Sequence, residues 1–466
     1  MTSGDDERAS AMRPWNAALL RSLQRFGADA MSFLALESKM MHWIDEAPPG
    51  GTGARVAYFD TGSAWVGAAG PLAAEDARSV AAARFMAAAR SRGRRASFFG
   101  TESLVAPHFK RLLLGEQPIF RPREWLEALP PRGSLREQLR RARAKGVRVR
   151  SVAADELGEG TPLSGKVLAL ARDWLQSRHM EPMGFLVALE LFQESSEHRY
   201  FLAERGGVPI GFLSAVPIYG HGAWLVEDVV RAREAPNGTT ESLFVALLHD
   251  VRDAPFVTLG LTPLSGDIVW PLRLARLVSR PLFDFPGLRA FRARLHPHEW
   301  QPVWLVHPEG QPAVVPLLDA LRAFANGTLL RFALRSIVAH PSGPPWLLAI
   351  PLVPWTSGLA VLAAFGRPSL LGFAIGPRWA WVVFDALLAV LLYGTAMRPS
   401  RSRLLFATLL AAGDAALSFV HVASAGLGEN PVEHVMRLLA VAAPCAGTVV
   451  LAWATTRAGT PGYSSR

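Results

Sequence analysis

The stretch Glu227-Asp-Val-Val-Arg-Ala-Arg-Glu-Ala-Pro-Asn-Gly-Thr239 decides the fold expected for the N-terminal part of the chain. It continues an apolar run, Ala223–Val229, whose composition predicts a β-strand. Its Pro-Asn-Gly is a turn signal, and a helical pattern follows from Thr239 to Val251. We expect the side chain of Asn237 or Thr239 to cap that helix. A strand, a tight turn and a helix N-terminus with glycine at the joint form an arrangement that is suited to binding an anion.

Short strand-like runs alternate with helical runs on both sides of this stretch, from about residue 30 to residue 315. The expected elements are paired strands at Arg55–Phe59 and Ser63–Gly67, a helix at Ala73–Arg92, a basic helix at Ser134–Lys145, antiparallel strands at Tyr200–Glu204, Pro209–Pro217 and Ala223–Val229, and a strand at Val257–Leu261. This order favours a domain of mixed α and β structure (α+β). The arrangement of strand, tight turn and helix also occurs in the acetyltransferase-like fold, which is built on a splayed mixed sheet.

The chain is basic, with 49 Lys and Arg residues against 39 Asp and Glu residues and a formal charge of +10. Only Lys39, Lys110, Lys145 and Lys166 are lysines, a bias that is typical of a GC-rich genome. The positive charge itself favours anionic partners, either lipid headgroups or RNA. The single cysteine, Cys445, excludes an intrachain disulfide and a cysteine-rich metal site.

The composition shifts near Pro344, where long apolar runs begin. Each of these runs has about the 20 residues that the hydrocarbon core of a bilayer requires. The expected transmembrane helices are Trp346–Phe365, Trp379–Met397, Leu404–Ala425 and Val435–Thr455. The chain therefore combines a large polar domain with a hydrophobic C-terminal block that crosses the membrane four times.

The charges in the connections between these helices predict their orientation. The second connection holds Arg398, Arg401 and Arg403, whereas the third holds Glu429 and Glu433 and no basic residue. Positively charged loops face the cytoplasm, which places the second connection, the C-terminal tail and the N-terminal domain on that side.

Two further observations bear on localisation. The first connection, with Arg367 and Arg378, fits this orientation less well. Met1–Arg13 is polar and lacks the apolar core of a signal peptide, which agrees with a cytoplasmic N-terminal domain. We therefore expect a multi-pass protein of the cell inner (cytoplasmic) membrane, with its catalytic domain in the cytoplasm.

Asp385 and Asp414 fall within the second and third expected spans. Ionisable groups inside a membrane are a functional hypothesis by default, and the alternative is that they pair with each other or with an arginine. Pro316–Ala339, before the first span, interleaves apolar residues with arginines. This pattern suits either an amphipathic helix on the inner leaflet or a soluble helix packed on the preceding domain.

Several stretches, in order along the chain, resemble those of the phosphatidylglycerol lysyltransferase C-terminal domain family, the aminoacyl-phosphatidylglycerol synthases. The Asp-x-x-Arg and Pro-Asn-Gly of the opening stretch carry this resemblance most clearly. The other matching stretches are Leu114-Gly-Glu116, Leu135–Gly146, Pro182-Met-Gly-Phe185, Leu259-Gly-Leu-Thr-Pro-Leu264 and Gly287-Leu-Arg-Ala-Phe-Arg-Ala-Arg-Leu-His-Pro297.

The resemblance implies two acetyltransferase-like (GNAT-like) halves in tandem, followed by the four-helix transmembrane block. The expected domains are a tail at 1–29, a first half at 30–133, a second half with the active site at 134–315, a juxtamembrane amphipathic segment at 316–345 and the transmembrane helices at 346–466. The family's reaction moves an aminoacyl group from a charged tRNA to a hydroxyl of phosphatidylglycerol. An aminoacyl ester is already activated, so aminoacyl-tRNA is a co-substrate and no cofactor is expected. The expected partners are charged tRNA, an anionic phospholipid and the membrane.

By the resemblance, Asp228 and Arg231 are the catalytic residues. Asp228 would act as the base or orient the attacking hydroxyl, and Arg231 would hold the lipid phosphate or the developing oxyanion. The alternative is a local salt bridge at a strand end. Glu227 could be the working acid instead, because strand alternation puts it and Asp228 on opposite faces and only one can point into a cleft.

The other expected site residues bind substrates. Arg292 and Arg294 stand where the family usually has lysine, and they keep the charge but do not readily release a proton. The remaining expected contacts are Asn237 and Gly238 for substrate and Arg136, Arg140 and Arg143 for tRNA. No histidine or cysteine spacing indicates a metal site.

Two alternative functions stay open at this stage. An acyl-CoA-dependent GNAT-type N-acyltransferase would need a Gln/Arg-x-x-Gly-x-Gly pyrophosphate loop, which the sequence lacks. A non-catalytic membrane-anchored tRNA- or lipid-binding protein would need no working Asp228. Family members usually place a large flippase block before this domain, whereas the hydrophobic block here is short and follows it, so lipid flipping is not supported.

Overall fold

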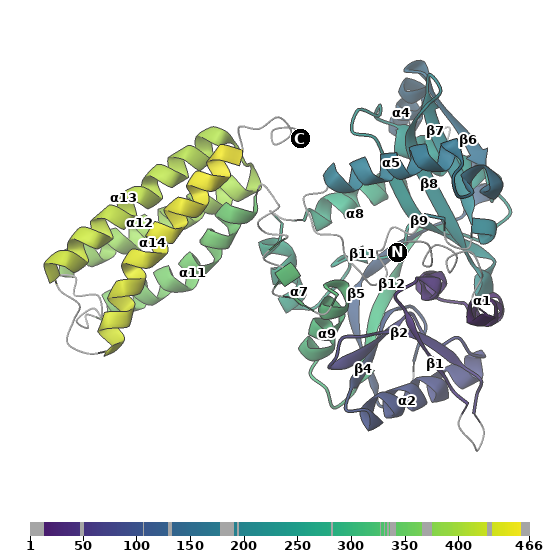
Figure 1. Ribbon diagram of the computed structural model, residues 1–466, viewed down its shortest axis with the longest axis horizontal. Coiled ribbons are helices and arrows are strands. Elements are labelled where there is room, and N and C mark those ends of the chain that lie inside the picture. Colours follow the sequence, from purple (N-terminus) through teal and green to yellow (C-terminus); the bar gives the residue numbers. More distant parts are fainter. Residues whose placement is uncertain are drawn as a thin grey trace, which may run out of the picture. The chain divides into compact units, whose positions relative to one another are not determined.

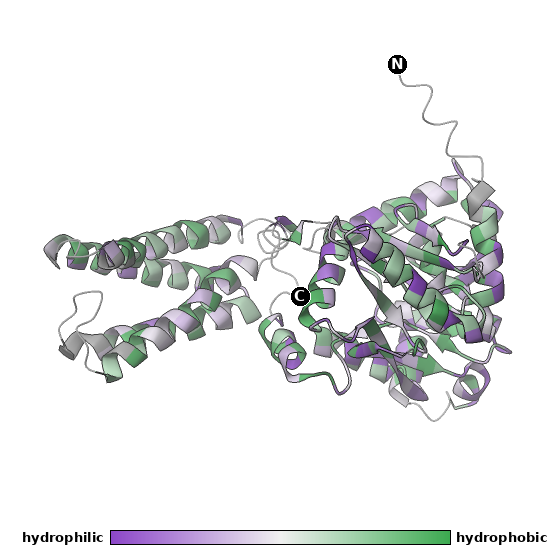
Figure 2. Ribbon diagram, turned by 90° about the horizontal axis from the view of Figure 1, so that it is seen from below, coloured by the Kyte–Doolittle hydropathy of each residue, from purple (hydrophilic) through white to green (hydrophobic). Residues whose placement is uncertain are grey.

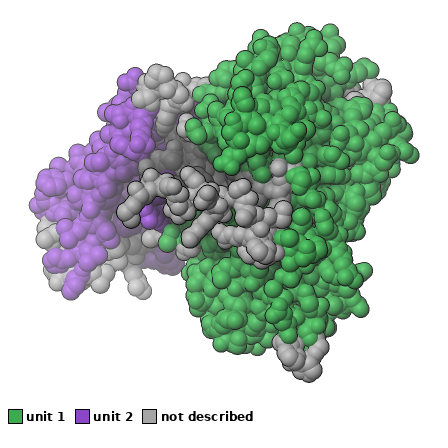
Figure 3. All heavy atoms as spheres, turned by 45° about the vertical axis from the view of Figure 1, so that its right-hand side comes forward, with its two compact units in different colours: residues 1–178, 182–276, 285–329 green, residues 179–181, 277–284, 330–466 purple. Residues whose placement is uncertain are grey.

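The computed structural model divides the chain into two compact units, which are described separately (Figure 3). Unit 1 comprises residues 1–178, 182–276 and 285–329, and unit 2 comprises residues 179–181, 277–284 and 330–466. The structure describes residues 14–46, 51–105, 107–128, 133–177, 191–192, 195–280, 283–326, 328–329, 331–332, 335, 342–365, 375–425 and 431–457. The predicted Pro182–Phe185 motif, the start of the predicted tail and most of the predicted first and third connections lie outside these ranges.

Unit 1 is built from the α/β elements that the alternating pattern predicts. Its strands are β1 (Met41–Ile44), β2 (Arg55–Asp60), β3 (Ala64–Ala68), β4 (Arg95–Thr101), β5 (Phe109–Phe120), β6 (Val147–Val152), β7 (Arg199–Arg205), β8 (Val208–Ile218), β9 (Ala223–Arg231), β10 (Val257–Thr258), β11 (Thr262–Pro263) and β12 (Glu299–Pro308). Its helices are α1 (Pro14–Phe26), η1 (Ala30–Leu36), α2 (Glu75–Ser91), α3 (Pro122–Glu127), α4 (Gly133–Ala144), η2 (Ala154–Leu157), α5 (Pro162–Ser177), η3 (Ser195–Glu197), η4 (Tyr219–His221), α6 (Thr239–Asp250), α7 (Trp270–Val278), α8 (Phe285–Arg294) and α9 (Val314–Phe324).

One mixed sheet of 12 strands runs through unit 1 (Figure 1). Its order is β1-β2-β3-β4-β12-β5-β10-β9-β8-β7-β6, with β11 paired to β5. Neighbours are antiparallel except for β3 with β4 and β9 with β10, which are parallel. The predicted α+β fold class with acetyltransferase-like halves is confirmed, and so are the three antiparallel strands β7, β8 and β9.

The sheet splays where β10 joins the two halves. This strand pairs with β9 only through Val257 and Thr258, which face Trp224 and Leu225. No other described strand pairs with this edge of β9. The part of β9 that follows Leu225 therefore has an unpaired edge on the side of β5. A short parallel strand between two long ones therefore creates the opening that the splayed-sheet prediction requires.

Helices cover both faces of the second half. Phe244 and Leu247 of α6 pack with Phe120 and Trp125 in one hydrophobic core. On the opposite face, Val167 of α5 packs in a separate core. These cores hold the splayed strands in place, because each buried apolar side chain contributes roughly 1.5–3 kcal/mol.

The Pro-Asn-Gly turn forms as predicted, but the helix cap differs from the prediction. Gly238 occupies the N-cap position of α6, and neither predicted side chain caps the helix. The Thr239 hydroxyl instead donates to the carbonyl of Pro236, 2.7 Å away. Gly238 has a φ of +94°, a conformation that glycine adopts with the least strain.

Unit 2 contains helices α11 (Gly343–Ala364), α12 (Ile375–Met397), α13 (Arg401–Ala425) and α14 (Pro431–Arg457). In the described residues, 4 segments are long and apolar enough to cross a membrane, namely Gly343–Val361, Trp379–Met397, Arg401–Ser424 and Arg437–Arg457. Figure 2 shows hydrophobic residues along all four helices. The predicted transmembrane block is confirmed, with helix ends that differ by a few residues.

The segment before the first span begins as a helix on unit 1. Ala320 and Ala323 of α9 are buried against Leu305 of the sheet. Asp319 accepts hydrogen bonds from the Arg95 guanidinium, the shorter of them 2.6 Å long. Val314–Phe324 is thus a helix packed on the preceding domain, and most of the rest of the predicted Pro316–Ala339 helix lies outside the described residues.

Replacement of Gly238 by alanine tests whether the turn is fixed by backbone geometry. A Cβ there would lie 2.5 Å from the Gln138 carbonyl oxygen of α4, so the positive φ and the clash both oppose the substitution. We expect Gly238→Ala to cost about 3 kcal/mol or more and the matched control Gly207→Ala, with a φ of +77° and open space around it, about 1 kcal/mol. Thermal unfolding of the detergent-solubilised chain measures both, and equal losses would contradict the packing argument.

Candidate functional site

A β-bulge shapes the site at the open edge of β9. Ser214 of β8 pairs with Asp228 and the next residue, Ala215, pairs with Val226, so Glu227 is an extra residue in the strand. A bulge interrupts the alternation of side chains. Burial, together with the negative charges of Glu227 and Asp228, raises the pKa of the Tyr200 hydroxyl, so both acids lie close to this one side chain. The expectation that they occupy opposite faces is wrong because of the bulge.

Aromatic side chains from neighbouring elements surround the two acids. His198 Nε2 lies 2.9 Å from Glu227 Oε2, and the His198 ring stacks on Tyr200 with 5.2 Å between ring centroids. Phe33 of η1 meets the edge of the same imidazole at 5.3 Å. These contacts fix the position of the Glu227 carboxylate.

Asp228 is held in an environment that favours its neutral form. Burial raises the pKa of its carboxyl well above the ordinary value, and the nearby charges of Glu227 and then Glu37 raise it further. A hydrogen bond with Ser214 acts in the opposite direction. A carboxyl with a raised pKa beside a second carboxyl is an arrangement suited to acid–base chemistry.

The Tyr200 hydroxyl adds a polar group to this cluster. The residue is 2% exposed, and within the described residues its hydroxyl oxygen has no hydrogen-bond partner. A buried hydroxyl left without a partner costs about 1–3 kcal/mol, so it is suited to bonding a polar atom of a ligand.

The predicted partner Arg231 lies apart from Asp228. It is exposed at the end of β9, and no ion pair joins it to Asp228 in the part of the chain that the structure describes. After the bulge, alternation resumes and directs Asp228 and Val230 to one face and Arg231 to the other. The structure thus contains no local salt bridge between the pair, and the proposed role of Arg231 remains a prediction.

Arg292 of α8 contacts the loop that follows β10. It is half-buried, and its guanidinium donates to the Gly260 carbonyl at 2.8 Å and to Thr262 Oγ1 at 2.7 Å. A Cβ on Gly260 would lie 3.2 Å from Leu225, two residues before Glu227, which places this loop against β9. Burial lowers the pKa of Arg292 to about 10, so it stays cationic at neutral pH. No carboxylate neutralises it within the described residues, which leaves it able to hold an anion.

The other predicted site residues lie in two places: Arg294 is on α8, and Asn237 and Gly238 form the turn before α6. Arg294 is exposed and stacks on Phe291, with its guanidinium carbon 5.9 Å from the ring centroid. Gly238 lies against α4, and the adjacent Asn237 is exposed. No hydrogen bond or ion pair joins any of the three to Glu227 or Asp228 in the described residues.

The basic helix α4 presents its predicted tRNA contacts to solvent. Arg136, Arg140 and Arg143 are exposed. Glu137 accepts from Arg140 at 2.8 Å and from Arg141 at 2.7 Å, so Arg140 is partly neutralised. Arg136 and Arg143 are therefore better placed than Arg140 to meet a phosphate backbone.

Sequence reasoning missed a buried network that anchors η1. Arg78 forms an ion pair of 2.6 Å with Asp29, and the amide of Ala30 donates to Glu102 Oε1 at 2.7 Å. The other end of η1 leads into Glu37, whose charge acts on Asp228. Because these partners are far apart in the chain, no local pattern could have revealed the network.

The Glu102 carboxyl makes stability depend on pH. Burial, and then the charge of Asp29, raises its pKa from 4.5 to about 8. The folded state keeps a proton on Glu102 that the unfolded state releases. The contribution of this carboxyl to the free energy of unfolding is therefore fully present below pH 4.5 and is lost as pH rises through about 8. Glu102→Gln keeps a donor and an acceptor without the titration.

We therefore expect Glu102→Gln to raise Tm at about pH 8.5 by several degrees and to leave Tm nearly unchanged at about pH 5, given roughly 2–4 °C per kcal/mol for large domains. Thermal unfolding at the two pH values measures this, with the exposed Glu75→Gln as the control. A Glu102→Gln Tm that falls equally at both pH values would contradict the neutral state of this carboxyl.

Comparisons with known proteins point to one family. The family described as "Phosphatidylglycerol lysyltransferase, C-terminal" matches residues 20–307. A phosphatidylglycerol lysyltransferase of Bacillus subtilis (strain 168) is 26% identical over 133 residues, which represent 26% of this chain and 15% of that relative. The aligned stretch thus spans only a small part of this curated protein.

Solved structures share the fold of unit 1. The C-terminal domain of a protein described as a lysylphosphatidylglycerol synthetase, from Agrobacterium fabrum, matches with a TM-score of 0.56 and 22% identity, over 67% of this chain and 98% of its own. L-PGS from Bacillus licheniformis matches with a TM-score of 0.56 and 19% identity, over 67% of this chain and 97% of its own. At these identities the likeness shows a common fold.

Proposed function

The chain belongs to the phosphatidylglycerol lysyltransferase C-terminal family, and from that premise we propose that it transfers an aminoacyl group from a charged tRNA to a hydroxyl of an anionic membrane lipid such as phosphatidylglycerol. The observation that carries this proposal is the carboxyl pair at the β9 bulge. Burial and the neighbouring charge of Glu227 raise the pKa of Asp228, and Arg292 of α8 stays cationic on the loop that follows β10.

The carboxyl pair can perform both proton transfers of such a reaction. The lipid hydroxyl oxygen attacks the ester carbonyl, and the ionised carboxylate accepts the hydroxyl proton. The ester bond to the ribose then breaks, and the protonated partner gives its proton to the departing ribose oxygen. Atoms and charges balance within the pair, so neither a cofactor nor a metal is required by this scheme. Among the described residues no group of three or more His, Cys, Asp or Glu could hold a metal ion.

Positive groups can hold the two anionic substrates. Arg292 would bind the lipid phosphate or the oxyanion, since a partly buried guanidinium interacts with an anion more strongly than a fully exposed one does. The exposed arginines of α4 would bind the tRNA backbone. The transmembrane block keeps the domain beside its lipid substrate, in the cytoplasmic membrane and with unit 1 on the tRNA side.

Replacement of Asp228 by asparagine tests the proposed chemistry. Asparagine has the same shape but cannot carry a proton between substrates, so we expect aminoacylated lipid to fall by about 100-fold or more. Mass spectrometry of lipids from expressing cells measures the product. The exposed Asp253→Asn is the matched control and should behave as the wild type does.

Two results would contradict this assignment. Equal product in wild type and Asp228→Asn would remove Asp228 from the chemistry. No product from either, together with coenzyme A binding by the chain, would favour an acyl-CoA-dependent transferase.

Charge removal on α4 tests the proposed tRNA contact. We expect Arg136→Ala/Arg143→Ala to weaken tRNA binding and to reduce the slope of log affinity against log salt by about 2, one for each lost phosphate contact. Titrations at several salt concentrations measure the slope. The control Arg90→Ala/Arg172→Ala removes the same charge from α2 and α5, and an equal change in slope there would show general electrostatics instead of a site.

A further inference from the structure

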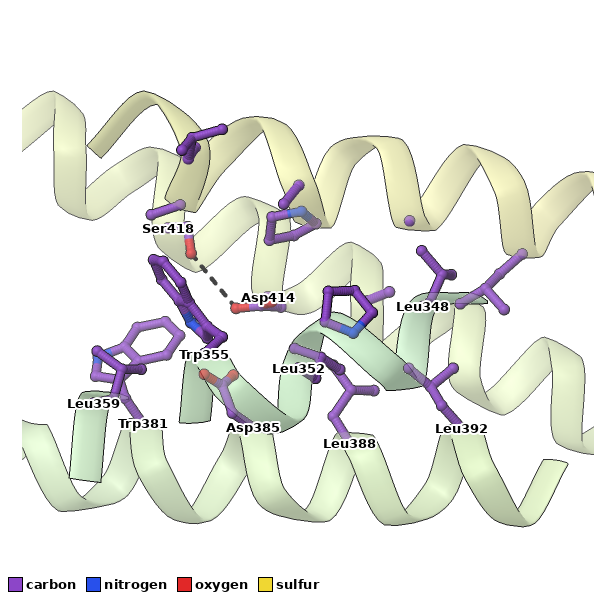
Figure 4. A pocket seen from close by; sticks show the side chains of 18 residues that line it. Leu348, Leu352, Trp355, Leu359, Trp381, Asp385, Leu388, Leu392, Asp414 and Ser418 are labelled. Atoms are coloured by element: carbon purple, nitrogen blue, oxygen red, sulfur yellow. Dashed lines mark hydrogen bonds between the residues drawn. The ribbon is translucent and has the colours of Figure 1, made fainter. Parts of the chain in front are cut away.

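The four helices of unit 2 line a partly open cavity of about 190 Å³ (Figure 4). Its walls come from α11, α12, α13 and α14 and are mostly apolar, with Leu352, Leu388 and Leu392 among the side chains that line it. The rings of Trp355 and Trp381 also line it. It thus has the mostly apolar lining that is typical of a site for a small organic group.

Two carboxyl groups enter this apolar space. Asp385 of α12 is 5% exposed and Asp414 of α13 is 7% exposed, and both line the cavity (Figure 4). The Ser418 hydroxyl lies 3.5 Å from Asp414 Oδ1. Among the residues that line the cavity there is no Arg, Lys or His, and no ion pair to either acid occurs within the described residues.

This arrangement lacks a positive charge. A buried carboxylate is strongly disfavoured without a cation, and two facing one cavity inside a bilayer are more so. Asp385 lies 6 residues into the span Trp379–Met397, or roughly 9 Å below its end at 1.5 Å per residue. A group carried by a lipid can reach that depth from the membrane interface.

The few oxygen atoms and the aromatic rings of the lining determine which kind of cation the cavity can bind. Ca²⁺ prefers about 6–8 oxygen ligands and Mg²⁺ keeps several waters, which this mostly apolar cavity does not accommodate. A primary ammonium needs few acceptors, and the aromatic rings of Trp355 and Trp381, which line the cavity, are groups that attract cations. The apolar walls suit the carbon chain that such a group would bring.

We propose that this cavity binds the primary ammonium group of a lipid, with Asp385 and Asp414 as its counter-charges. The inference stands on the cavity and its charges, and it holds whether or not unit 1 has the proposed transferase activity. The ammonium donates hydrogen bonds to the two carboxylates, and the apolar part of the lipid follows the leucine walls.

Binding of dodecylamine to the full chain in detergent tests the site. We expect dodecylamine to bind at least tenfold more tightly than the uncharged dodecanol and Asp385→Asn/Asp414→Asn to abolish that preference. Asp253→Asn, which alters an exposed acid of unit 1, should retain it. Equal affinities for the two probes in the wild type, or an unchanged preference in the double variant, would overturn the proposal.

A second variant and a second probe separate the remaining explanations. Ala440→Leu fills the cavity while keeping both acids, so dodecylamine affinity should fall at least tenfold even if the double variant fails to fold. Native mass spectrometry of chain extracted from mixed vesicles should find phosphatidylethanolamine retained severalfold over phosphatidylcholine, whose quaternary ammonium donates no hydrogen bond. Equal retention of the two lipids would contradict a site for a lipid-borne primary ammonium.

Discussion

The extra residue in β9 is the constraint on which the rest of the site depends. A regular strand would turn Glu227 and Asp228 to opposite faces of the sheet. The bulge opposite Ser214 and Ala215 brings both carboxyls near Tyr200, and like charges at short range cannot both ionise easily. A change of one residue in register therefore brings the two carboxyls together and raises the pKa of Asp228.

Two other features of unit 1 support this pair. The two-residue strand β10 leaves the edge of β9 open beyond Leu225, and the loop that follows is held by the half-buried Arg292, which donates to the Gly260 carbonyl. The short helix η1 is anchored through Asp29 and leads into Glu37, which adds negative charge beside Asp228. The fold thus gathers acids beside Asp228 through η1, and it holds the loop after β10 through Arg292.

Much of this architecture could be predicted from local pattern. The strands around Glu227–Thr239, the turn and the four transmembrane helices follow from hydrophobic periodicity and from run length. The bulge could not, because register depends on the partner strand. The contacts of His198 and Tyr200, the loop contacts of the half-buried Arg292 and the exposure of Arg294 depend on packing between distant segments, so sequence alone treated the two arginines as equivalent.

The protonation state of Asp228 tests the central claim most directly. Difference infrared spectroscopy between wild type and Asp228→Asn, recorded across pH, isolates the carbonyl stretch of this one carboxyl. We predict a protonated-carboxyl band that persists at neutral pH in the wild type, because burial and the charge of Glu227 raise the pKa of Asp228. A band that disappears in the range of an ordinary aspartate would contradict the coupled pair.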